Sequence, residues 1–187
     1  MIFLSMCWLI DMDWHYTEPG KGGWSGWTWN KRLFPDPGRL LADLKKEGVK
    51  LTLNLHPADG FAFYEEPYRA IATDIGMNPE GKDTIPWVTS DKKLMKAVFK
   101  NALHPMEKEG VDFWWLDWQQ DYLYPLVRGT NMKHLPWMNH IYYNYSSGNH
   151  LRGAGFSRWA GWGDHRHPIQ FSGDAVATGT YSALSRP

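Results

Sequence analysis

An acidic side chain follows each of three strand-like runs in this sequence. The runs and their acids are residues 7–10 with Asp11 and Asp13, residues 111–116 with Asp117, and residues 168–173 with Asp174. A run that is apolar on both faces is typical of a buried parallel strand, and the carboxyl ends of such strands meet at the edge where α/β barrels build their sites. The sequence therefore predicts that the three acidic groups share one site.

A pair of carboxyl groups is the requirement of glycoside hydrolysis. One group attacks or stabilises the oxocarbenium-like carbon, and the other delivers a proton to the leaving oxygen. Asp117 and Asp174 are the candidates for these two roles. Taken alone, Asp117 is equally compatible with a helix N-cap, because short loops after strands often end in Asp. The acids that follow the two other strand-like runs favour the catalytic interpretation of Asp117.

Composition indicates a neutral partner. The 20 basic and 20 acidic residues cancel, so no charge pattern favours nucleic acid or an anionic membrane surface. Twelve Trp and nine Tyr are far more than a chain of 187 residues usually carries. Flat amphipathic rings stack on the apolar faces of sugar rings and offer N–H or O–H groups to hydroxyls, although about half of them must simply fill the core.

The order of elements predicts alternating strands and helices. The expected helices are 37–46, 64–73, 92–109 and 136–145, and the expected later strands are 49–56, 111–117, 153–158 and 168–173. A long loop rich in Gly and Trp follows the first strand. Five strands alternating with helical connections are the pattern of parallel βαβ units. An open doubly wound sheet fits nearly as well, but no glycine-rich phosphate turn follows the first strand, which disfavours an oxidoreductase.

The motifs around the acids resemble those of glycoside hydrolase family 31, the α-glucosidase and α-xylosidase family, over nearly the whole chain. Four of them occur in the family's order: Asp11-Met12-Asp13-Trp14, Trp115-Leu116-Asp117, Ser157-Arg158 and Phe171-Ser172-Gly173-Asp174. Two departures affect the pocket wall rather than the acids. Trp118 stands where the family's α-glucosidases commonly have Met, and Phe171 stands where the family usually has Trp.

The resemblance implies a retaining mechanism. Asp117 would attack the anomeric carbon while Asp174 protonates the glycosidic oxygen and later activates water. The resemblance also implies that Asp13 and Arg158 bind hydroxyls of the non-reducing sugar. The sugar itself, whether glucose, xylose, galactose or N-acetylgalactosamine, is left open, as is the linkage.

The resemblance further implies a partial (β/α)8 TIM barrel. A complete barrel usually needs about 250 residues, and family members carry a first strand, two closing strands and further β domains that this sequence does not show. We expect residues 1–187 to be a fragment of one catalytic barrel domain, weakly active alone, whose natural amino terminus lies upstream. No signal peptide or stretch of ~20 apolar residues is present, so the compartment stays open.

Four further residues are candidates for sugar contact. Trp115 shares a strand face with Asp117 by period-two geometry. His56 ends a strand and is either a pocket hydrogen-bonder or a structural cap. Trp14 lines the pocket or packs the first loop, and Asp11 either faces the site or is a buried acid that orders that loop.

No cofactor is expected, because a carboxylate pair needs no metal for this reaction. Asp164, His165 and His167 lie close together, but the interposed Arg166 and the adjoining Pro168 argue against a metal site. The partner expected is an oligosaccharide or glycoconjugate, with no nucleic acid or membrane, and the oligomeric state is open. The competing interpretation is a carbohydrate-binding pseudoenzyme that keeps the aromatic rim without turnover.

Overall fold

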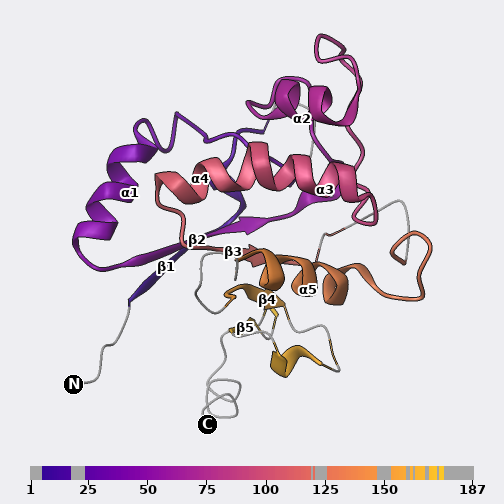
Figure 1. Cartoon of the computed structure of the whole chain (residues 1–187). Coiled ribbons are helices and arrows are strands. Elements are labelled where there is room, and N and C mark those ends of the chain that lie inside the picture. The colour runs from indigo at the N-terminus through magenta and orange to yellow at the C-terminus, as the bar shows by residue number, and fades with distance from the viewer. Residues whose placement is uncertain are drawn as a thin grey trace.

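The computed structural model shows a curved sheet covered by helices (Figure 1). It describes residues 6–17, 24–118, 120, 126–146, 153–158, 161, 163–166, 169–171 and 173–174. The strands are β1 (Cys7–Ile10), β2 (Lys50–Leu55), β3 (Phe113–Leu116), β4 (Phe156–Arg158) and β5 (Gln170–Phe171). They are parallel, and each pairs with the next one along the chain.

This sequential order distinguishes the two architectures that the sequence left open. In a doubly wound sheet the strand order reverses at a switch point, whereas in a barrel wall each parallel strand lies beside the next. The five strands curl as half of a barrel (Figure 1), so the prediction of a partial (β/α)8 barrel is confirmed.

Among the described residues, five α-helices lie on one side of the sheet. They are α1 (Pro37–Lys46), α2 (Tyr68–Ile75), α3 (Lys92–Val98), α4 (His104–Glu109) and α5 (His134–Ser146). In Figure 1, α1, α3 and α4 lie above β2 and β3, and α5 lies in front of β3 and β4. Asp36 caps α1 by accepting from the Arg39 N–H, and Asp91 caps α3 in the same way.

Two predicted helices differ from the observed ones. The helix expected at 64–73 begins four residues later, after Pro67, because the chain before it turns to bring Glu65 inward. The helix expected at 92–109 is divided by a π-helical segment, Phe99–Leu103. Pro105 follows this segment, and a proline inside a helix removes an N–H donor and clashes with the preceding turn.

The register gives the sheet two different faces. Residues 51, 53 and 55 of β2 pair alongside Trp114 and Leu116, and their apolar side chains are buried under the helices. On the other face, Asn54 lies beside Trp115, and Trp115 lies beside Phe156. This second face is the inner wall of the half-barrel. Its polar and aromatic residues lie on the same face of the sheet as Asp117.

Candidate active site

Asp117 lies where β3 ends, at the carboxyl edge of the sheet, and is 6% exposed. Its Oδ1 accepts from Arg158 Nε at 2.5 Å and from the Trp118 backbone N–H at 2.7 Å. Arg158 is the last residue of β4 and shares the inner face with Asp117. The alternative that Asp117 caps a helix has no support in the described residues, since its side chain bonds to a guanidinium rather than to a first helical turn.

Arg158 also reaches the second predicted acid. Its Nη2 donates to Asp174 Oδ2 at 2.9 Å, so one guanidinium bridges the two carboxylates. The Asp174 side chain is 86% exposed. Gly173, with φ of 107°, lets the chain pass close by, because a Cβ there would lie 2.8 Å from Arg158 Nη1. The predicted nucleophile and the predicted acid therefore stand on either side of one arginine.

The other oxygen of Asp117 faces β2. Asn54 Nδ2 donates to Oδ2 at 3.4 Å, and His56 Nε2 lies 3.4 Å from the same oxygen. Burial alone raises the pKa of this carboxyl group, but the neighbouring imidazole, guanidinium and backbone N–H outweigh burial. Together they hold the pKa of Asp117 well below its usual range, so this side chain is an ionised carboxylate at neutral pH.

A cluster of aromatic side chains lines the site on the inner face of the sheet. Trp115 packs against Phe156 and Phe171, with ring centroids 5.2 Å and 5.3 Å away. The Arg158 guanidinium lies 4.9 Å from the centroid of the Phe171 ring. Phe171 thus supports the bridging arginine through a cation–π contact, and Trp115 lies on the same face as Asp117, as the alternation of the strand predicted.

The first acidic motif folds differently from the expectation. Residues Met12–Trp14 form a short 3-10 turn rather than a continuation of the strand. The two-residue alternation of a strand therefore does not place Asp11 and Asp13 on one face. Both acids are exposed, and Asp11 accepts from the Met12 N–H rather than being a buried acid. Trp14 is fully buried, and its Nε1 donates to the Asn54 carbonyl at 2.8 Å. The structure therefore places Trp14 in the core, where it supports β2, and not on an open pocket wall.

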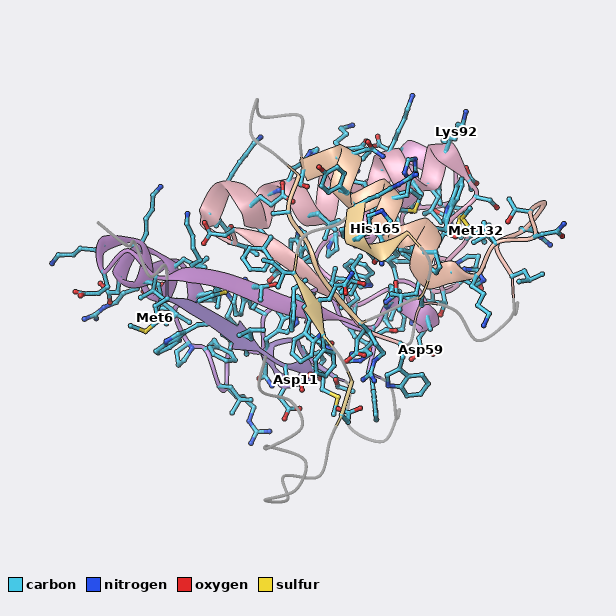
Figure 2. The ribbon with its side chains drawn as sticks, turned by 90° about the horizontal axis from the view of Figure 1, so that it is seen from below. Met6, Asp11, Asp59, Lys92, Met132 and His165 are labelled. Atoms are coloured by element: carbon cyan, nitrogen blue, oxygen red, sulfur yellow. The ribbon has the colours of Figure 1, made fainter. Side chains whose placement is uncertain are left out.

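Figure 2 shows the direction of the sheet. Met6 lies toward one end, and Asp11 and Asp59, which follow β1 and β2, lie toward the other. Asp117 and Arg158 end β3 and β4 at that same carboxyl edge, because the strands are parallel. Asp11, Asp117 and Arg158 thus lie at the carboxyl edge of the sheet. Within the described residues, neither Asp11 nor Asp13 hydrogen-bonds to Asp117 or Asp174.

Sequence reasoning overlooked Asn54, which contacts Asp117, and two residues farther from it, Ser25 and Glu65, which bond to or within the loop after β1. Asn54 is two positions before His56 on the same strand face, so alternation could have identified it. Ser25 donates a short hydrogen bond to the His56 carbonyl, and Glu65 accepts from the Trp27 N–H and the Thr28 hydroxyl. No local pattern marks these last two contacts, which join segments more than thirty residues apart.

The described part of the chain holds no group of three or more His, Cys, Asp or Glu side chains that could bind a metal ion. Of the residues weighed for a metal site, His167 lies outside the described residues. No helix in the described ranges is both long and apolar enough to cross a membrane.

A half-barrel of sequential parallel strands with paired carboxylates at its carboxyl edge is the arrangement of (β/α)8-barrel enzymes. Residues 4–186 match the TIM-barrel domain of the glycosyl hydrolases family 31. The chain therefore belongs to glycoside hydrolase family 31, as the motifs around the acids indicated.

Solved enzymes share the fold. A family 31 sulfoquinovosidase from E. rectale, in complex with an aza-sugar inhibitor, is 17% identical with a TM-score of 0.56, over 89% of this chain and 28% of that chain. A cycloalternan-degrading enzyme from Trueperella pyogenes, in complex with cycloalternan, is 14% identical with a TM-score of 0.52, over 74% and 22%. This chain thus spans about a quarter of the length of these enzymes. No curated protein matches it.

Proposed function

We propose that the chain carries the catalytic centre of a retaining exo-α-glycosidase acting on oligosaccharides or glycoconjugates. The observation that supports this most is the guanidinium of Arg158, which contacts both Asp117 and Asp174. Retention requires two carboxyl groups about 5–5.5 Å apart, whereas inversion requires roughly 6.5–9.5 Å. Two carboxylates held by adjacent nitrogens of one guanidinium favour the shorter spacing.

The two acids differ in the way that the mechanism requires. Asp117 is buried and kept ionised, which suits a nucleophile that attacks the anomeric carbon. Asp174 is exposed, so an incoming sugar and solvent water can both reach it. In the proposed first step, the carboxylic acid of Asp174 donates its proton to the glycosidic oxygen as Asp117 bonds to the anomeric carbon and the leaving group departs. Water then attacks the anomeric carbon, Asp174 accepts a proton from that water, and the bond to Asp117 breaks, so the sugar leaves with its α configuration retained.

Covalent labelling tests the proposal. An α-configured cyclophellitol-type probe should add one sugar equivalent to the 21.7 kDa chain, and peptide mass analysis should locate it on Asp117. Asp117→Asn should abolish the label, whereas Asp112→Asn, a matched change at an acid on the same run, should retain it. Turnover of a nitrophenyl α-glycoside by the chain alone should be low, since part of the barrel is expected to be missing.

The competing function is a carbohydrate-binding module without turnover. A module of this kind would bind sugar and take no label, because binding alone needs neither a nucleophile nor an acid. The ion pair that Arg158 makes with both carboxylates argues against this alternative, since a lectin-like site gains nothing from holding two acids on one cation. Sugar binding without covalent labelling by the probe would support the carbohydrate-binding module.

A further inference from the structure

Two exposed indoles lie on the loops that follow β1 and β3, Trp118 directly after Asp117 in the chain and Trp24 against His56. Trp118 is 51% exposed and Trp24 is 40% exposed. Their ring centroids are 5.8 Å apart, and the ring planes meet at 79°. The two rings therefore form an open corner, and neither belongs to the buried core.

His56 joins this corner to the carboxylate. The Trp24 ring lies edge-on to the His56 imidazole, with centroids 5.3 Å apart, and His56 Nε2 lies 3.4 Å from Asp117 Oδ2. Arg158, which carries Asp174, approaches the opposite oxygen, Oδ1. Trp24 is thus linked through His56 to Oδ2 of Asp117, whereas Asp174 is linked through Arg158 to Oδ1.

Hydrogen bonds fix the chain at or next to both indole-bearing residues. The residue after Trp24 is Ser25, whose hydroxyl donates to the His56 carbonyl and accepts from the Asp59 N–H at 2.9 Å. Trp118 donates its own N–H to Asp117 Oδ1 at 2.7 Å. Large apolar side chains fixed at a site and left open to solvent mark a binding surface.

We propose that Trp24 and Trp118 are the walls that hold the apolar face of the reacting sugar, the pyranose ring whose anomeric carbon meets Asp117. The inference rests on the proposed function and adds to it the residues that select the sugar. When the anomeric carbon is bonded to Asp117 and the glycosidic oxygen faces Asp174, the rest of the sugar ring extends toward the corner formed by Trp24 and Trp118. Indole faces stack on the C–H groups of such a ring, and the indole N–H groups donate to its hydroxyls.

The charges around the corner favour a neutral sugar. Within the described residues, Arg158 is the only lysine or arginine that pairs with Asp117, and its guanidinium is already shared between two carboxylates. An anionic sugar such as a sulfonated one needs a free cation or several donors. The aromatic corner beside His56 supplies apolar surface instead, so the proposal commits to an uncharged pyranose.

Indole ¹⁵N NMR tests the proposal on the 187-residue chain. Trp24→Phe and Trp118→Phe assign the two indole signals, and Trp8→Phe assigns a control indole of similar exposure (49%) on β1. Methyl α-glucopyranoside and methyl α-xylopyranoside are the neutral probes, and methyl α-sulfoquinovoside is the anionic one. We expect the Trp24 and Trp118 signals to shift with a neutral probe while Trp8 stays in place. Absence of a shift at both residues, or a shift only with the anionic probe, overturns the proposal.

Affinity gives the second readout. Replacing both indoles by Ala should weaken binding of the neutral probe about tenfold or more, because both stacking faces are lost. Trp8→Ala should leave the affinity unchanged. If the Ala variants do not fold, as checked by circular dichroism, the Leu variants replace them, since Leu keeps bulk without an aromatic face. Unchanged affinity in the folded double variant also overturns the proposal.

The two proposals fail separately. If the covalent probe labels Asp117 while the Trp24 and Trp118 signals ignore every sugar, the mechanism stands and the aromatic wall is wrong. If the two signals shift but Asp117 takes no label, the wall stands and the retaining mechanism is wrong.

Discussion

At the scale of single residues, Arg158 joins the two candidate acids of the site. It is the last residue of a three-residue strand, and its contacts reach 41 and 16 positions along the chain to Asp117 and Asp174. The guanidinium is a permanent cation with a planar fork of donors, so it can keep two carboxylates close together that would otherwise repel each other. Replacing Arg158 should therefore change the pKa of Asp117 more than that of any other acid.

We expect Arg158→Gln to raise the pKa of Asp117. The favourable charge and hydrogen bond disappear while burial of the carboxyl group remains, and burial favours the protonated form. Carboxyl ¹³C NMR across a pH titration measures the change. Arg39→Gln is the matched control, because Arg39 forms an exposed pair with Asp43 and does not contact Asp117. An Asp117 titration that is the same in both variants would contradict the role given to Arg158.

At the scale of elements, the loop after β1 is held over the sheet by a buried carboxyl group. Glu65 is 5% exposed and accepts from the Trp27 N–H at 3.1 Å and the Thr28 hydroxyl at 2.6 Å. Burial raises its pKa to about 7, and the two hydrogen bonds oppose burial only in part. Because the folded-state pKa exceeds the ordinary value of 4.5, folding is most favourable when Glu65 is protonated.

The stability that Glu65 contributes should be complete below about pH 4.5 and should be lost as the pH rises through about 7. A shift of this size corresponds to roughly 3 kcal/mol in the free energy of unfolding. Glu65→Gln should remove this part of the pH dependence, measured by urea unfolding at several pH values. Glu47→Gln, at an exposed position after α1, should keep it. Equal pH profiles for the two variants would show that Glu65 is not the titrating group.

Two glycines with similar φ angles should respond differently to substitution. Gly48 and Gly60 have φ of 72° and 76°, but a Cβ at Gly48 meets nothing within 4 Å, whereas one at Gly60 would lie 2.1 Å from the Ile85 carbonyl oxygen. Gly48→Ala should cost about 1–2 kcal/mol of unfolding free energy from backbone strain alone. Gly60→Ala should cost about 3–5 kcal/mol, because steric overlap with the backbone adds to the strain. Denaturant unfolding compares them, and equal losses would refute the clash.

At the scale of the whole molecule, the curved sheet ends in two strands that each have one neighbour among the described residues. Leu9 of β1 and Ile169 before β5 are 49% and 50% exposed. An open strand edge with apolar side chains is a template for pairing with another chain. We propose, as the sequence led us to expect, that the chain is part of one catalytic barrel and that its edges are covered in the complete domain.

The isolated chain should therefore self-associate. Light scattering after size-exclusion chromatography should give masses above 21.7 kDa that increase with concentration. Leu9→Lys should reduce this association, because a charge on an edge strand opposes pairing. Met132→Lys, at an exposed position outside the sheet, should not change it. A monomer at every concentration would contradict the open edge.

The sequence by itself indicated parallel strands that alternate with helices, and it indicated the acids at the strand ends. Apolar runs that end in Asp, separated by capped helices, specify local structure, and they mark Asp117 and Asp174 as candidates. The choice between a barrel and a doubly wound sheet came from the order of the strands. Strand lengths were less well determined: in the described residues of the runs expected at 153–158 and 168–173, the strands are Phe156–Arg158 and Gln170–Phe171.

Only the tertiary structure decided which side chains meet. The register between strands places Arg158 between two acids, and the fold of the first loop buries Trp14 in the core while leaving Trp24 exposed beside His56. These outcomes depend on contacts between segments tens of residues apart, and local propensity carries no information about such contacts. The sequence therefore determined which residues could react, and packing decided which of them share a site.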